Sequence, residues 1–312
     1  MPNLLILSKL YPEYKSLIDA ANLPGLTIFT TADPAEALQR AADSEIIFGE
    51  PSLLCQVINQ MPDLRWVQSA WAGIEPLLKP GLRRDYTLTN IRHVYGPLMS
   101  EYVFAYLLLI ERRILTRWQS QIAGRWDASP HGTLQGRQLG LLGVGSIGAY
   151  LAGTARHFGM RVRGYTHHSE SCPDIERYYH GDTLPEFATG LDYLVCTLPG
   201  TATTRHIVDA PLLAALPPHA WFVNIGRGSV VDDLALAAAL HAGRLGGAVL
   251  DVFTQEPLPP EHPLWHTPNT FITAHTAAIN HPPDIAAVFI DNYQRYLRGE
   301  PLLGLVDFDL GY

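Results

Sequence analysis

The sequence predicts an α/β fold built from two doubly wound parallel sheets, with one domain inserted into the other. Short apolar segments alternate with helical patterns along most of the 312 residues, which indicates parallel strands joined by helices. One apolar segment, 138–142, is followed directly by a glycine-rich turn and a helix. The last helical pattern, 285–298, follows the proline-rich break 281–284, so we expect the chain to cross back to its first sheet there.

The first 98 residues are expected to form a small α/β domain. Its strands are predicted at 4–7, 26–30, 45–49 and 65–69, where apolar residues run between turn-forming residues. Its helices are predicted at 13–21, from Asp33 onward, and at 52–60. Asp33 is a typical capping residue, because Pro34 and Glu36 follow it in the first turn.

A long helix is predicted from Glu101 to Trp118, and it is apolar over much of its surface. A helix of this kind is buried. Two interpretations stay open: a core helix within one subunit, or a helix at an interface between domains or subunits. The apolar run 102–110 is too short to span a bilayer, so we expect no membrane segment.

The segment 138–158 reads as a buried strand, a glycine turn and a helix that begins near Ser146 and Ile147. The glycines with the spacing G-x-G-x-x-G are Gly143, Gly145 and Gly148. Such glycines permit a sharp turn, close approach of a pyrophosphate and tight helix–strand packing. The pattern is weak alone, but between a strand and a helix it predicts a dinucleotide-binding unit of the Rossmann type, against a tight turn that binds nothing.

Further strands are predicted after this unit, and the clearest helix among them is 232–242. They are 160–165, 191–196, 221–225, 247–251 and 270–273. Ligands of such sheets bind at the carboxyl ends of the strands. Polar or turn-forming segments follow several of these strands, namely 198–199, 224–228, 251–253 and His275. The sequence therefore predicts an active site at this edge.

The composition excludes several classes of protein. A net charge of −8 with 17% charged residues argues against nucleic acid as a partner. The three cysteines predict no disulfide framework, and the N-terminus carries no signal-peptide pattern, so we expect a cytoplasmic protein. The histidines of the loop 255–268 have no third ligand beside them, so no metal site is expected.

These motifs resemble the D-2-hydroxyacid dehydrogenases, and most closely the glyoxylate/hydroxypyruvate reductases. The segments that carry the resemblance are 72–74, 143–148, 198–204, 224–229, 250–257 and 273–278. The resemblance implies a flavodoxin-like substrate-binding domain in 1–98, a dinucleotide-binding domain in 99–283, and a crossover helix and tail in 284–312. It also implies a cleft between the domains and a homodimer.

The resemblance implies three catalytic residues, and their chemistry suits the roles. His275 would be the acid/base, because histidine titrates near working pH. Glu256 would hold the imidazole, as carboxylates do in other carboxylate–histidine pairs. Arg227 would bind the carboxylate and the carbonyl of a small 2-oxo acid through its planar fork. The alternatives are a structural histidine, a solvated glutamate and a surface arginine.

The remaining site residues are also implied by the resemblance. Backbone N–H groups of Ala72, Gly73 and Ile74 would form a second clamp on the substrate carboxylate. The cofactor-binding residues would be Gly143, Gly145, Ser146, Ile147, Gly148, Thr166, His167, Thr197, Ile225, Gly226 and Asp251. Asp251 has an alternative role as a cap after its strand.

The residues after the strand 160–165 favour NADPH, with NADH as the alternative. An NAD enzyme places Asp or Glu there to hold the ribose 2′-OH, whereas this chain has no acid before Glu170. Thr166 and Ser169 can donate to a 2′-phosphate, and His167 or His168 can carry charge near it. We therefore expect an NADPH-dependent reductase of a small 2-oxo acid. The alternatives are an NAD-dependent dehydrogenase of another substrate and a non-catalytic nucleotide sensor.

Overall fold

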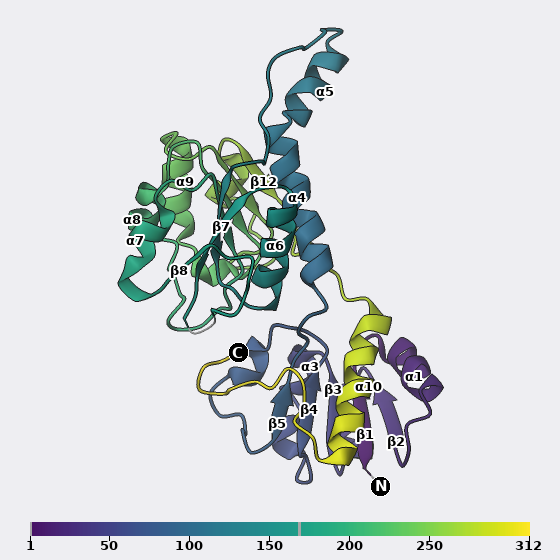
Figure 1. The fold of residues 1–312 in the computed structure, drawn as a ribbon. Coiled ribbons are helices and arrows are strands. Elements are labelled where there is room, and N and C mark those ends of the chain that lie inside the picture. Colours follow the sequence, from purple (N-terminus) through teal and green to yellow (C-terminus); the bar gives the residue numbers. More distant parts are fainter. Residues whose placement is uncertain (1, 168–169) are drawn as a thin grey trace. The chain divides into compact units, whose positions relative to one another are not determined.

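The structure is a computed structural model, and it describes residues 2–167 and 170–312. The chain forms two compact units: Met1–Val94 with Asn280–Tyr312, and Tyr95–Ile279. The second unit is therefore inserted into the first. Each unit contains one parallel sheet flanked by helices (Figure 1), which confirms the predicted α/β class.

Unit 1 contains a five-stranded sheet in the order β2-β1-β3-β4-β5. Its strands are β1 (Asn3–Leu7), β2 (Thr27–Thr31), β3 (Ile46–Gly49), β4 (Trp66–Ser69) and β5 (Thr87–Thr89). This is the flavodoxin-like order. The short edge strand β5 was not predicted, since three residues give too little periodicity to recognise.

The helices of unit 1 come from both ends of the chain. They are α1 (Tyr11–Ala20), α2 (Pro34–Ala41), α3 (Pro51–Leu54), η1 (Ile58–Gln60), η2 (Glu75–Leu78) and α10 (Pro282–Arg298). The Asp33 side chain caps α2 by accepting from the N–H of Ala35 at 2.8 Å. The prediction of one helix at 52–60 was wrong, because the chain leaves α3 after Leu54 and forms only a 3₁₀ turn at η1.

Helix α10 joins the core of unit 1 although it lies far from β3 and β4 in the sequence. The Phe289 ring stacks on Trp66 at 5.4 Å and on Phe48 at 5.1 Å between ring centroids. The helix begins at Pro282 rather than at Ile285, since prolines fit the first turn of a helix, where their missing N–H has no partner to lose. In Figure 1 helix α10 and the C-terminal segment lie beside the sheet of unit 1.

Unit 2 contains a seven-stranded sheet in the order β12-β11-β10-β9-β6-β7-β8. Its strands are β6 (Gln138–Leu142), β7 (Arg161–Tyr165), β8 (Arg177–Tyr179), β9 (Tyr193–Cys196), β10 (Trp221–Asn224), β11 (Gly247–Leu250) and β12 (Thr270–Ile272). The order contains the Rossmann arrangement, with a reversal between β6 and β9. Strand β8 was not predicted from the sequence.

Helices cover both faces of this sheet. They are α4 (Gly96–Glu111), α5 (Ile114–Ile122), α6 (Ser146–His157), α7 (Leu184–Ala188), α8 (Ala210–Ala215), α9 (Asp233–His241), η3 (Gly181–Thr183), η4 (Gly228–Val230) and η5 (Pro263–His266). Two apolar cores result, one beneath α4 and α6 and the other beneath α7, α8 and α9. In the part of the chain that the structure describes, no helix is long and apolar enough to cross a membrane.

The single helix predicted from Glu101 to Trp118 is two helices. Helix α4 ends at Glu111, and Arg113 adopts a left-handed backbone (φ 54°) before α5 begins. The two halves also differ in burial. Val103, Phe104 and Leu107 of α4 lie in the core, whereas α5 extends beyond the end of the sheet (Figure 1) and is mostly exposed.

Candidate active site

The glycine turn after β6 leaves open space beside the start of α6. Gly143 has a φ of +104°, and a Cβ on Gly148 would lie 2.3 Å from the carbonyl oxygen of Gly143. A Cβ on Gly145, in contrast, would have no atom within 4 Å. Two glycines are therefore required by the backbone itself, while Gly145 keeps the space in front of the helix free.

The same turn fits the pyrophosphate of a dinucleotide. Helix α6 begins at Ser146 and receives no side-chain cap from Gly145, so the first N–H groups remain for an anion. The Thr197 hydroxyl, at the end of β9, donates to the Gly143 carbonyl at 3.0 Å and holds the turn in place. These observations favour cofactor binding by the predicted residues Gly145, Ser146 and Ile147.

The end of β7 is shaped by a histidine that the sequence analysis missed. Because Tyr165 pairs with Tyr179, the segment after β7 lies beside His180, which follows β8. His180 Nδ1 lies 2.7 Å from the Thr166 carbonyl oxygen, and its Nε2 contacts the Glu170 carboxylate. Thr166 is buried and His167 is exposed. His168 and Ser169 lie outside the described residues.

The carboxyl ends of the remaining strands align in one row, which places three predicted loops side by side. Asn224 of β10 is level with Cys196 of β9 and Leu250 of β11, and Leu250 is level with Ile272 of β12. The loops with Arg227, Glu256 and His275 follow these strands. The sequence placed them at strand ends; the register brings them to one edge of unit 2.

The loop with Arg227 is fixed from within. The Asn224 side chain accepts from the N–H of Gly226 at 3.1 Å and donates to the Arg227 carbonyl at 3.0 Å. Arg227 Nη1 donates to the Gly226 carbonyl at 2.7 Å, and the side chain is half-buried. Ile225 and Gly226 are buried, and a Cβ on Gly226 would lie 2.6 Å from the Leu198 carbonyl oxygen.

His275 and Glu256 form a pair. His275 Nδ1 lies 2.8 Å from Glu256 Oε2, and about half of the imidazole is exposed (51%). The other carboxylate oxygen, Oε1, accepts from the N–H of Phe253 at 2.8 Å. A carboxylate fixed at one oxygen can orient the ring through the other, which leaves Nε2 free to face a substrate.

Gly228 brings the arginine loop against the glutamate loop. A Cβ on Gly228 would lie 1.8 Å from the carbonyl carbon of Phe253, so only glycine fits. Phe253 in turn donates its N–H to Glu256, which holds His275. A continuous series of contacts therefore links the backbone next to Arg227 with the imidazole.

Asp251 holds the loop that carries His275. Asp251 is buried (1% exposed); Oδ1 accepts from the N–H of Thr276 at 2.8 Å, and Oδ2 accepts from that of Ala277 at 3.0 Å. The His275 N–H donates to the Asp251 carbonyl at 2.8 Å, and His275 has a left-handed backbone (φ 56°). Such a conformation is costly outside glycine, and the hydrogen bonds on both sides maintain it.

Tyr102 of α4 extends this support and was also missed by the sequence analysis. Its hydroxyl lies 2.7 Å from the Thr273 hydroxyl, which donates to Asp251. Burial raises the pKa of Tyr102 well above its usual value, so the phenol stays neutral. A tyrosine about forty residues before the glycine turn gives no local sequence signal of this contact.

The predicted carboxylate clamp lies in unit 1, just after β4. The Ala72 carbonyl accepts from the Asn90 side chain at 2.8 Å, and the Ile74 carbonyl accepts from the N–H of Leu77 at 2.8 Å. Ile74 is buried, whereas Ala72 and Gly73 are half-buried. The segment is thus an ordered turn between β4 and η2.

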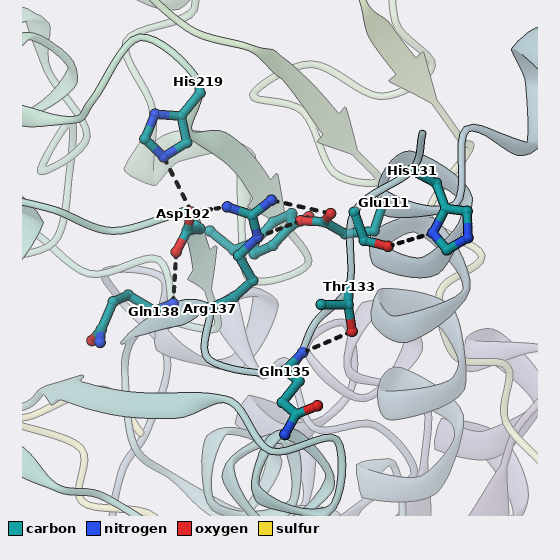
Figure 2. Close-up of polar contacts among 10 residues, drawn as sticks. Glu111, His131, Thr133, Gln135, Arg137, Gln138, Asp192 and His219 are labelled. Carbon is teal, nitrogen blue, oxygen red and sulfur yellow. Dashed lines mark hydrogen bonds and ion pairs between the residues drawn. The ribbon is translucent and has the colours of Figure 1, made fainter. Parts of the chain in front are cut away.

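A second polar cluster lies at the amino ends of the unit 2 strands, away from the predicted site (Figure 2). Arg137 pairs with Glu111 at 2.7 Å and with Asp192 at 2.9 Å. Tyr193 donates to Glu111 at 2.7 Å, and His219 lies 3.1 Å from Asp192. The cluster lines a cavity of about 260 Å³ and joins the end of α4 to the sheet, at the base of α5.

Comparison with known proteins identifies the family. The profile of the D-isomer specific 2-hydroxyacid dehydrogenase NAD binding domain matches residues 104–277. Glyoxylate/hydroxypyruvate reductase A of Klebsiella pneumoniae is 36% identical over 217 residues, which cover 70% of each protein.

Solved structures agree over the whole chain. A D-isomer specific 2-hydroxyacid dehydrogenase family protein from Aeromonas salmonicida superposes with a TM-score of 0.91 at 39% identity and covers 99% of both chains. An NADPH-dependent glyoxylate/hydroxypyruvate reductase from Sinorhizobium meliloti, solved with NADP and sulfate, gives 0.86 at 28% identity and covers 100% of both. The resemblance seen in the sequence is thereby confirmed: the chain belongs to the D-isomer specific 2-hydroxyacid dehydrogenase family, whose members are NAD(P)-dependent oxidoreductases.

Proposed function

We propose that this protein uses NADPH to reduce a small 2-oxo acid, such as glyoxylate or hydroxypyruvate, to the D-2-hydroxy acid. The observation that carries the proposal is the His275–Glu256 pair, 2.8 Å apart, at the same strand-end edge as the Arg227 loop. An acid/base held by a carboxylate and a cation for an anionic substrate are the groups that carbonyl reduction of such an acid requires.

In this proposal each side chain has one task. The Arg227 guanidinium binds the substrate carboxylate and polarises the carbonyl. His275, protonated at Nε2, donates a proton to the oxygen that becomes the alcohol, and Glu256 stabilises the imidazolium through Nδ1. The nicotinamide, when bound, supplies the hydride. Ala72, Gly73 and Ile74 are proposed as a further contact to the substrate carboxylate.

The cofactor contacts are proposed on the same grounds. Gly143, Gly145, Ser146, Ile147 and Gly148 would hold the pyrophosphate at the start of α6. Thr166 and His167 would lie near the 2′-phosphate, and Thr197, Ile225, Gly226 and Asp251 would border the rest of the cofactor. The residue directly after β7 is Thr166 and not a carboxylate, which removes the group that repels a 2′-phosphate and favours NADPH over NADH.

We further propose a homodimer, formed through an arm that comprises residues 112–133. Ile114, Trp118 and Ile122 recur along one face of α5, and the exposures of Trp118 and Ile122 are 57% and 67%. The opposite face carries Ser120, which is buried (7% exposed), and the flanking Arg117 donates to the Ser129 carbonyl at 2.7 Å. An apolar face that points to solvent while the polar face packs inward is typical of a surface that another chain covers.

A cytoplasmic location is proposed as well, because the three cysteines are free.

The direct test is NADPH oxidation by the purified protein with a panel of 2-oxo acids, compared with NADH. His275→Ala is expected to lower kcat by at least about 1,000-fold and to leave the Kd for NADPH unchanged. Arg227→Ala should raise the KM for the 2-oxo acid and also lower kcat, since one charge-assisted contact to substrate contributes about tenfold or more.

Two outcomes would contradict the proposal. A protein that binds NADPH but oxidises it with no 2-oxo acid of the panel would instead be a nucleotide sensor. A His275→Ala variant that keeps wild-type kcat but loses NADPH affinity would assign the histidine to cofactor binding. Faster turnover with NADH than with NADPH would contradict the proposed cofactor but not the proposed reaction.

A further inference from the structure

His180 is held by acceptor oxygens at both ring nitrogens. Its Nδ1 lies 2.7 Å from the Thr166 carbonyl oxygen, and its Nε2 contacts Glu170 Oε1. A neutral imidazole carries only one N–H and can satisfy only one of two acceptors. The geometry therefore selects the imidazolium, which donates to both.

The chemistry around the ring supports the same charge state. The Thr166 carbonyl and then the Glu170 carboxylate raise the pKa of His180 above its usual value. Other titratable groups near this edge are His167, which follows Thr166, Tyr165 at the end of β7, and Asp182 in η3. The His180 side chain is 41% exposed, so the charge is accessible from solvent.

The position of this charge relates it to the cofactor. In Rossmann domains the residue at the end of the second strand selects between a ribose 2′-OH and a 2′-phosphate, and NADP-binding proteins carry an arginine nearby. Here the second strand is β7, the residue is Thr166, and the cation that contacts Thr166 is His180 at the end of the neighbouring strand β8. The described residues of the segment 166–176, which follows β7, include no arginine or lysine.

We propose that the His180 imidazolium binds the 2′-phosphate of NADPH and supplies the positive charge that an arginine supplies in other NADP-binding domains. The inference rests on the proposed use of NADPH. Glu170 is the exchangeable counter-ion: its side chain is 59% exposed, and it leaves Nε2 when the phosphate takes its place. His180 is thus a specificity-determining residue, placed by the strand β8 that it follows.

The proposal gives NADPH binding a pH dependence of defined sign. The two acceptor oxygens select the charged form of His180, and this charge is lost as the pH rises through the raised pKa of the folded protein. The 2′-phosphate itself titrates at about pH 6, so its charge is nearly constant between about pH 7 and 9. Over this interval NADPH affinity should fall, and NADH affinity should stay nearly constant.

The experiment measures the Kd of NADPH and of NADH by fluorescence titration at about pH 7 and pH 9. His180→Asn should raise the Kd of NADPH about tenfold at the lower pH and change the Kd of NADH less than about twofold. It should also abolish the pH dependence of NADPH binding. His180→Arg should bind NADPH tightly at both pH values. The matched control is His219→Asn, because His219 also pairs with a carboxylate, Asp192, but lies at the opposite end of the sheet.

Glu170→Gln separates this proposal from its main competitor. If Glu170 is a counter-ion, removal of its charge should lower the Kd of NADPH a few-fold, about the effect of one exposed ion pair. The Kd of NADH should stay unchanged. If Glu170 instead holds the ribose 2′-OH of NADH, the variant will weaken NADH, and the proposal is overturned.

The cofactor preference of the wild-type protein and that of the His180→Asn variant test separate proposals. Wild-type protein that does not prefer NADPH to NADH would overturn the proposed cofactor. Wild-type protein that prefers NADPH, together with a His180→Asn variant that prefers it equally, would overturn the role of His180 alone.

Discussion

Two carboxylate side chains in this site use each of their two oxygens for a separate contact. Glu256 uses one carboxylate oxygen to fix itself on the Phe253 N–H and the other to hold His275, each at 2.8 Å. Asp251 similarly divides its two oxygens between Thr276 and Ala277. Each carboxylate therefore has a positional task and an electrostatic one, and a substitution that keeps the shape but removes the charge can separate them.

Glu256→Gln is such a substitution. The amide oxygen can still accept from Phe253, so the loop should persist, but the imidazolium loses its counter-charge. We expect kcat to fall by about 100-fold, with an unchanged Kd for NADPH and a Tm within about 1 °C of wild type. The measurements are steady-state kinetics, cofactor titration and thermal unfolding. Glu261→Gln, an exposed change in the same loop, is the control. Equal kinetics for the two variants would exclude the proposed role of Glu256 in stabilising the imidazolium.

At the scale of elements, two glycines of the turn between β6 and α6 have different tasks, one in stability and the other in cofactor binding. Gly148→Ala forces a Cβ against the Gly143 carbonyl at 2.3 Å, whereas Gly145→Ala meets nothing within 4 Å. The first change should destabilise the fold by about 1–3 kcal/mol. The second should leave the unfolding free energy within about 0.5 kcal/mol of wild type and weaken NADPH by at least about tenfold.

The weakening in Gly145→Ala is expected because the added methyl group enters the space proposed for the pyrophosphate. Urea unfolding and cofactor titration on the same two variants give both quantities. A Gly145→Ala variant with wild-type NADPH affinity would mean that the pyrophosphate does not approach this turn.

At the scale of the whole molecule, the arm is anchored at its base and apolar along its outer face. Gly132 donates its N–H to the Glu111 carbonyl at 2.9 Å, and Arg137 ties Glu111 to the sheet. A Cβ on Gly132 would lie 1.7 Å from Glu111 Oε2, so a larger residue there would displace the carboxylate that binds Arg137. A held segment with exposed tryptophan, such as Trp126 at 95%, is suited to bind another chain without first becoming ordered.

The combined change Trp118→Glu and Ile122→Glu should therefore convert a dimer into a monomer. Each charge would have to enter the proposed interface without a partner, which costs several kcal/mol in total. Sedimentation velocity over a range of protein concentrations is the measurement. Leu234→Glu, at an exposed leucine of α9 (71%), is the control and should leave the mass unchanged. Wild-type protein that sediments as a monomer would remove the proposal.

The sequence by itself determined the fold class, the family and the residues proposed for chemistry. Strand–helix alternation and the glycine spacing are local patterns, so they survive without coordinates, and the motifs around Arg227, Glu256 and His275 are contiguous. Element boundaries were less secure: the helix 101–118 is divided at Arg113, and β5 and β8 were missed, because three-residue strands and a single left-handed residue leave no periodic trace.

Only the tertiary structure decided which distant residues support the site. His180 reaches Thr166 because β8 pairs with β7, and Tyr102 reaches Thr273 because α4 packs on the sheet. Likewise, Gly228 is required by the backbone of Phe253, which belongs to another strand end. Contacts of this kind depend on sheet order and register, and these are set by the packing of the whole unit rather than by neighbours in the chain.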